Sequence, residues 1–241
     1  MHFYIEHNIG HHKHVATPED PSTARYNEPI YVFWVRSTSQ SYINAWKLEA
    51  RKLRREGHEF WSTRNRMIHF TLVQTIYLAV VFILTSWQGL LAMLILGVFS
   101  FILLETINYI ENYGLVRAKK KNGDYERVQP KHSWNSNHVL GRVVLYELTR
   151  HSDHHYIASK KYQILDHQEE ALLLPFGYPA SMLISLFPPL IGLHPLFPWH
   201  RGANKVGTFR QINCCFCQVF VQMVELFCHP NYLSSICRIF R

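Results

Sequence analysis

The chain has 241 residues, of which 48% are hydrophobic, and its formal net charge is +8. This charge is compatible with binding to nucleic acid, with an anionic membrane surface, or with basic loops beside membrane spans, so the positions of the charges must decide. All five cysteines lie between residues 214 and 237, which does not match the disulfide framework of a small secreted domain.

The first histidine-rich segment lies near the N-terminus and holds the string EHNIGHH at residues 6–12. On an α-helix His7 and His11 share a face, and His12 lies about 100° further round. Two imidazoles one turn apart can hold one metal ion, and a third that is offset by one residue can reach a second ion. The spacing therefore predicts metal binding.

Two apolar runs follow further along the chain. Residues 67–85 are almost entirely apolar, an uncharged break covers residues 86–89, and residues 90–104 are again apolar. A membrane-spanning helix needs roughly 20 such residues. We therefore expect two spans, at about 67–85 and 89–109. The alternative is a buried helical hairpin in a soluble core.

Basic residues flank this hairpin on both sides, in residues 36–66 and in residues 117–131. Because positive residues mark cytoplasmic loops, both flanks are expected in the cytoplasm, with Trp87 on the far side of the membrane. Topology then explains the charge, and no nucleic-acid surface is needed. Residues 119–121, all lysine, would also suit an acidic redox partner.

The second histidine-rich segment holds the string RHSDHH at residues 150–155. His151, His154 and His155 lie within one helical turn. Both segments flank the hairpin on the same expected side, so folding can bring them together at one membrane face. Six histidines exceed what one tetrahedral zinc ion needs, and they suit two metal ions.

Several neighbouring groups are candidates for orienting these imidazoles through the second ring nitrogen. Asp153 lies inside the second segment. Glu19 and Asp20 follow the first, although a proline-flanked turn explains them equally well. His138 lies between the hairpin and the second segment, where a plain loop is the alternative.

The remaining residues are less informative. Residues 171–193 are apolar but interrupted by prolines, which favours a kinked interfacial helix. We expect a membrane domain at residues 1–202 and a divergent, cysteine-containing tail at residues 203–241. A zinc site in the tail is the alternative to a membrane-associated end.

Three strings resemble the alkane 1-monooxygenase family, which belongs to the membrane fatty-acid desaturases and hydroxylases: residues 6–24, 108–115 and 147–165. The resemblance covers roughly residues 1–190. It implies an all-α, integral-membrane helical bundle with a histidine-rich di-iron site on its cytoplasmic side. It also implies an oxidoreductase that hydroxylates an alkane or fatty-acyl chain with O2, using electrons from a rubredoxin- or ferredoxin-like donor.

Carried over by position, the resemblance assigns two iron ions to His7, His11, His12, His151, His154 and His155. The family usually has a histidine where this chain has Asn112, and an amide oxygen is a weaker ligand. Asn112 is therefore a candidate position in the metal site. The alternative is that Glu111 and Asn112 are simply the polar end of a helix.

The family also has an earlier H-E-x-x-H-K box, and this chain begins just before the string at residues 6–12. We therefore expect a fragment that lacks the first histidine box. The alternatives to a monooxygenase are a fatty-acyl desaturase of the same superfamily, an inactive membrane fragment with an incomplete metal site, and a membrane zinc-binding scaffold.

Overall fold

The structure, a computed structural model, describes residues 2–187. The cysteine-containing tail predicted from residue 203 lies outside the described residues, and so does the end of the proline-interrupted segment at residues 171–193. The boundary at residue 203 and the nature of the tail therefore stay predictions.

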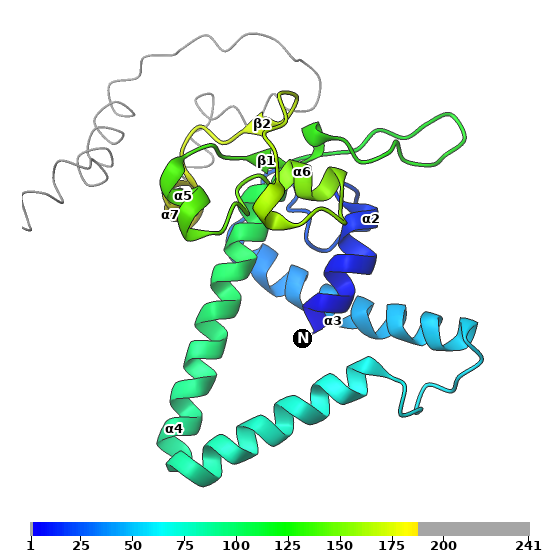
Figure 1. The fold of residues 1–241 in the computed structure, drawn as a ribbon, viewed down its shortest axis with the longest axis vertical. Helices are drawn as coiled ribbons and strands as arrows, with labels where there is room; N and C mark the ends of the chain where they lie inside the picture. The colour runs from blue at the N-terminus through cyan, green and yellow to red at the C-terminus, as the bar shows by residue number, and fades with distance from the viewer. Residues whose placement is uncertain (1, 188–241) are drawn as a thin grey trace, which may run out of the picture. The chain divides into compact units, whose positions relative to one another are not determined.

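The described part of the chain is mostly helical (Figure 1), which agrees with the predicted class. Its helices are α1 (His2–Ile5), the π-helix η1 (Glu6–His11), α2 (His12–His14), α3 (Ile30–Arg55), α4 (Arg66–Asn112), the 3₁₀ helix η2 (Pro130–His132), α5 (Val139–Val144), α6 (His151–Tyr156), the 3₁₀ helix η3 (Tyr162–Ile164) and α7 (Tyr178–Ser185). Two short strands, β1 (Trp134–Asn135) and β2 (Leu172–Leu173), pair in parallel, with Trp134 opposite Leu172.

Helix α3 supports the first histidine segment. Its buried residues recur every three or four positions, at Ile30, Phe33, Ser37, Ser41, Ala45, Glu49 and Leu53. This spacing forms one face of a helix, and α3 packs against α1 and η1. Small side chains at the middle of that face let α3 approach the N-terminal helices closely, so α3 supports the first histidine segment from one side.

Helix α4 is two helices joined at a kink. Ser86 has φ 60° and ψ −168°, which is not helical, and it lies inside the break predicted at residues 86–89. At the start of the helix, the Asn65 side chain accepts hydrogen bonds from the backbone N–H groups of Met67 and Ile68, which is an N-cap. Figure 1 shows the two arms diverging from the kink.

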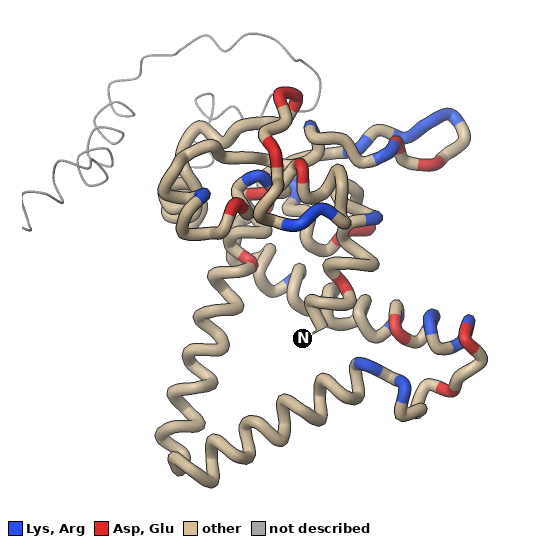
Figure 2. Tube along the Cα trace, in the orientation of Figure 1, with Lys and Arg blue, Asp and Glu red and all other residues tan. Residues whose placement is uncertain are grey.

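The middle of α4 is apolar on every side and is not covered by the other residues that the structure describes. Between the basic start of α4 at Arg66 and the acidic Glu105, neither arm carries a charged residue, as Figure 2 shows. In the most apolar stretch only 17% of residues are buried, whereas residues 105–112 are all buried. Within residues 2–187, α4 is the one helix long and apolar enough to cross a membrane.

The main hydrophobic core lies at the end of α4. It joins the last turns of α4 to the start of α3, to the strands and to α7, through residues that include Phe33, Tyr109, Tyr113, Trp134 and Tyr178. A smaller cluster of Ile5, Ala45 and Met67 ties α1 to α3 and to the start of α4. The two clusters hold the first histidine segment between the two ends of α4.

Candidate metal centre

The first histidine segment begins as a π-helix, not as the α-helix that its spacing suggested. In a π-helix hydrogen bonds join residues five apart, so the residue five positions on comes round to the face that the residue four positions on also occupies. His7 and His12 therefore face the same group, with ring centroids 4.7 Å apart. Which histidines share an ion stays a prediction: the rings of His7 and His11 are stacked with centroids 5.1 Å apart, but the ring nitrogens group His11 with His151 and His155.

The second histidine segment is the short helix α6, whose start is fixed by strand β1. The Asn135 side chain accepts a hydrogen bond from the Ser152 N–H at 2.8 Å and donates one to the Ser152 hydroxyl at 2.7 Å. The rings of His151 and His155 lie side by side, with centroids 4.0 Å apart. His154 points to the other group of histidines.

The six predicted histidines come together as two groups of three that could hold metal ions: His7, His12 and His154, and His11, His151 and His155. In each group one ring nitrogen per histidine lies within 4.8 Å of the others. Two nitrogen pairs are closer still. The Nε2 atoms of His7 and His154 are 3.3 Å apart, and those of His11 and His155 are 3.0 Å apart. Each group draws on both segments, which confirms that folding unites them.

Most of these imidazoles are held in the neutral form that a metal ligand needs. Burial, followed by repulsion from neighbouring histidines, lowers the pKa of His7 to about 2 and that of His12 to about 3. The same causes hold the pKa of His151 and of His155 well below the usual value. His11 differs: burial alone would lower its pKa, but the Asp20 carboxylate raises it above the usual value.

Two partners orient the buried group. His11 Nδ1 lies 2.8 Å from Asp20 Oδ2, and His155 Nδ1 lies 2.7 Å from Ser133 Oγ. Both contacts leave the Nε2 atoms facing one another, which is how metal-binding histidines are usually oriented. The expectation for Asp20 is confirmed. Ser133 was missed, and its only signal was its place in the polar segment before the second histidine box.

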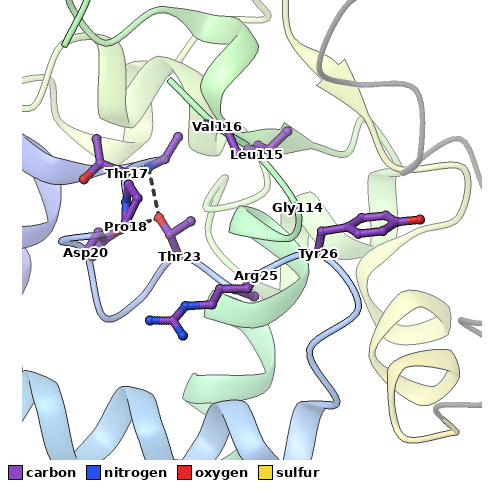
Figure 3. A pocket seen from close by; sticks show the side chains of 11 residues that line it. Thr17, Pro18, Asp20, Thr23, Arg25, Tyr26, Gly114, Leu115 and Val116 are labelled. Atoms are coloured by element: carbon purple, nitrogen blue, oxygen red, sulfur yellow. Dashed lines mark hydrogen bonds between the residues drawn. The ribbon is translucent and has the colours of Figure 1, made fainter. Parts of the chain in front are cut away.

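The loop that carries Asp20 is firmly supported. The Thr23 hydroxyl donates to Asp20 Oδ2 at 2.5 Å and accepts from the Ala16 N–H at 2.9 Å, as the dashed lines in Figure 3 show. A cavity of about 160 Å³ lies beside this loop, between residues 16–26 and residues 114–116. Its walls are mostly apolar, so we assign the cavity no catalytic or metal-binding role and read it as a gap in the packing beside the Asp20 loop.

Three other candidates do not orient the histidines. The Asp153 carboxylate accepts hydrogen bonds from Lys160 at 2.8 Å and Gln168 at 2.6 Å, so it fastens the loop after α6. His138 is exposed and its ring lies beside Gly177. Glu19 is exposed and accepts a hydrogen bond from the Tyr125 hydroxyl at 3.3 Å. The Asp153 expectation is wrong because the chain after α6 folds back over that carboxylate.

Glu6 is a further buried acid, close enough to Asp20 and His11 to interact with them electrostatically. Neither carboxylate oxygen has a hydrogen-bond partner among the described residues, and a side chain at Gly10 would meet Oε1 at 2.7 Å. Burial, helped by the nearby Asp20 charge, raises the pKa of Glu6 to about 7. Close to neutral pH it is therefore often protonated, which limits the negative charge placed near His11.

The donor atoms fit a metal ion. Buried polar atoms are nearly always hydrogen-bonded, yet both ring nitrogens of His12 and both of His151 lack a hydrogen-bond partner within residues 2–187. Two ring nitrogens about 3 Å apart can share a proton in an N–H···N hydrogen bond, or, when both are unprotonated, a metal cation. Imidazole nitrogen suits iron, zinc, copper and nickel, so the donor type alone does not choose the metal.

Comparison with known proteins places the chain. The fatty acid desaturase family matches residues 1–184. The chain belongs to this family. It is 43% identical over 188 residues to alkane 1-monooxygenase 2 of Pseudomonas aeruginosa, 44% over 188 residues to alkane 1-monooxygenase 2 of Alcanivorax borkumensis, and 43% over 187 residues to the alkane 1-monooxygenase of Ectopseudomonas oleovorans. These matches cover 78% of this chain and 50%, 49% and 47% of the relatives, so the chain spans about half their length. The resemblance noted from the three strings is confirmed.

In this desaturase-family chain, Asn112, the candidate seventh ligand, and its neighbour Glu111 make different contacts. Asn112 is buried, its Nδ2 donates to the backbone oxygen of Asn108 at 3.1 Å, and its Oδ1 has no hydrogen-bond partner in the described region. Glu111, by contrast, reaches the histidines: its Oε2 lies 3.2 Å from His151 Nε2. The metal role of Asn112 stays a prediction, and Glu111 is more than a polar helix end.

Proposed function

We propose that this chain carries the di-iron centre of a membrane monooxygenase, which hydroxylates the terminal carbon of an alkane or of a fatty-acyl chain. The observation that carries the proposal is the pair of three-histidine groups, each built from both histidine segments, beside the buried end of a long apolar helix. The similarity to alkane 1-monooxygenases supports the reaction type.

In this proposal the two groups would each hold one iron ion, with Asp20 and Ser133 orienting His11 and His155. Iron supplies the O2 chemistry that side chains cannot. In the overall reaction one oxygen atom enters a C–H bond and the other leaves as water, which consumes two electrons and two protons. The electrons come from a rubredoxin- or ferredoxin-like donor, and the basic residues 119–121 are a suitable surface for an acidic partner.

The exposed apolar surface of α4 supports a location in a membrane. A helix that is apolar on all sides needs an apolar environment, and residues 2–187 leave most of this one uncovered. Each arm has roughly 20 residues or more, which is about 30 Å of helix and enough to cross the hydrocarbon core. Basic residues such as Arg66 and Arg117 lie near the two ends, which supports a cytoplasmic position for the histidines.

The apolar arms also account for the class of substrate. An alkane carries no polar group, so only apolar surface can bind it. The second arm of α4 leads from the kink to the buried turn at residues 105–112, next to the histidines. A hydrocarbon that lies along this arm, dissolved in the membrane, would have one end close to the metal groups.

The test is product analysis with the purified, iron-loaded chain in lipid nanodiscs, supplied with O2, a reduced donor and either an n-alkane or a fatty acid. A primary alcohol or ω-hydroxy acid that forms only with iron supports the proposal. A new double bond would assign the chain to the desaturase branch of the superfamily instead. No product from a chain shown to hold iron would contradict the proposal for this chain.

A further inference from the structure

A basic corner lies where α3 meets α4, directly before the first apolar arm. Glu49, buried on α3, accepts a hydrogen bond from Arg66 at the start of α4, with Oε2 2.6 Å from Nη2. The ring of Phe60, in the connecting loop, lies 5.7 Å from the ring of Trp46 on α3, centroid to centroid. The loop therefore folds back along the last turns of α3, and residues 46–66 form one continuous surface, the basic corner.

The basic corner carries more cations than its own acids can pair. Residues 46–66 contain seven Lys or Arg and three Glu, a net charge of +4. Two of those acids are engaged, because Glu49 pairs with Arg66 and Glu56 pairs with Lys52 at 3.9 Å. Five exposed cations form no salt bridge within residues 2–187: Lys47, Arg51, Arg54, Arg55 and Arg64.

Four of the five cations form a stripe on α3. Residues 47, 51, 54 and 55 recur at spacings that place them on one face of a helix. The opposite face of the same turns is buried, at Ala45, Glu49 and Leu53. The stripe therefore points away from the protein core, and it runs toward the loop that carries the fifth cation.

An exposed aromatic pair lies beside the cations. Trp61 is 80% exposed, and its ring meets the Phe60 ring edge-on with centroids 5.0 Å apart. Trp61 lies a few residues before Met67, where the apolar part of α4 begins. Tryptophan favours the headgroup level of a bilayer, where its apolar ring and its N–H are both satisfied. With α4 in a membrane, the basic corner therefore lies at the depth of the lipid headgroups.

These features match the chemistry of an anionic phospholipid. Its phosphate accepts hydrogen bonds from Arg and Lys, while its acyl chains extend along the apolar arm that begins at Met67. A cluster of about four to eight basic residues directly beside a membrane span is typical of such binding. An acidic protein would also suit the charge, but it would not account for an exposed tryptophan beside an apolar span.

We infer that the basic corner binds the headgroups of anionic phospholipids and selects them over zwitterionic ones. The inference rests on the proposed membrane location of α4, and it goes beyond orientation, because it predicts which lipids stay bound. Each cation near an anionic surface favours binding by roughly fivefold, and salt weakens the effect. Replacing three of the cations should therefore change the lipid selection measurably.

The test uses the full chain, purified in mixed micelles that hold phosphatidylglycerol and phosphatidylcholine in equal amounts. Mass spectrometry gives the ratio of the two lipids that stay bound. The corner variant combines Lys47→Gln, Arg51→Gln and Arg54→Gln, and glutamine has nearly the helix propensity of lysine and arginine. The matched control replaces residues 119–121, all lysine, by glutamine, which removes the same charge from another exposed segment.

The unmodified chain and the control should retain more phosphatidylglycerol than phosphatidylcholine, and high salt should reduce this ratio. In the corner variant the ratio should be at least about fivefold lower. Its unfolding temperature in lipid-free detergent should equal that of the unmodified chain, because all three side chains are exposed. If that temperature falls, the charge-keeping variant Lys47→Arg with Arg51→Lys and Arg54→Lys decides: a retained ratio supports the inference, and a lost one overturns it.

The outcomes separate this inference from the proposed function. A chain that inserts into bilayers but retains both lipids equally overturns the inference alone. An equal drop in the corner variant and the control would assign the selection to net charge and overturn it too. An unchanged ratio in the corner variant, with weaker binding of an acidic electron donor, would make the corner a protein-docking surface and also overturn it. A chain that does not enter bilayers refutes the inference together with the proposed membrane location.

Discussion

The corner between the arms of α4 depends on Gly89, because any larger residue there would force the chain at the kink to move. A methyl group built on Gly89 would lie 1.8 Å from Thr85 Oγ1 and 2.3 Å from Thr85 Cβ. The Oγ1 clash could be relieved by rotating the side chain, but Cβ is fixed to the backbone. Gly89→Ala must therefore push the two arms apart at the kink. Overpacking of this kind costs about 1–3 kcal/mol, and the rigid contact places Gly89→Ala toward the upper end.

The assay is thermal or denaturant unfolding of the detergent-solubilised chain. Gly97→Ala is the matched control, because nothing lies within 4 Å of a methyl group added there and alanine favours a helix over glycine by about 1 kcal/mol. Gly89→Ala should lower the stability, and Gly97→Ala should leave it unchanged or raise it. The double variant Thr85→Gly with Gly89→Ala removes both clashing atoms and should recover part of the loss. Equal stability of the two single alanine variants would refute the reasoning.

Three further predictions use the same structure. Ser86 adopts a backbone conformation that is essentially restricted to glycine, so Ser86→Gly should raise the unfolding temperature by relieving about 1–3 kcal/mol of strain; an unchanged temperature would argue against strain at the kink. Asp20→Asn should weaken iron binding about 10- to 100-fold, measured by chelator competition, since Asp20 orients His11; unchanged affinity would show that the contact is dispensable. Burial would raise the pKa of Glu28, but hydrogen bonds from the Arg36 side chain and the Arg25 backbone N–H hold that pKa below the usual value. The stability that Glu28 adds should therefore be complete above about pH 4.3 and be lost as the pH falls further, and Glu28→Gln should flatten that acid limb in unfolding measured against pH.

The sequence was sufficient to find the ligand candidates. All six histidines chosen from the two strings lie in the two groups, and the kink in α4 falls inside the predicted break. These succeeded because they depend on local information. Closely spaced histidines and long apolar runs with an uncharged interruption predict the same local structure in almost any tertiary environment.

The pairing of the histidines was not accessible in the same way. Periodicity arguments assume about 3.6 residues per turn, and the π-helix at Glu6–His11 breaks that assumption. A methyl group on Gly10 would crowd both Glu6 and Leu48 of α3, so the local winding is matched to tertiary packing. A single sequence does not reveal this contact.

The supporting residues failed for a related reason. Ser133 is far from the histidine strings along the chain, and only the packing of β1 brings it to the site. Asp153 is adjacent in sequence but its carboxylate is taken by Lys160 and Gln168. Sequence proximity therefore misled where the partner was decided by a loop that returns over α6.

The most direct test of the whole account is the metal content of the purified, full-length chain, measured with His7→Ala and His151→Ala beside it. The two histidines belong to different groups, so the account predicts roughly two irons in the unmodified chain and about one in each variant. No iron in the unmodified chain, or two irons retained in both variants, would contradict the claim that these histidines build two metal sites.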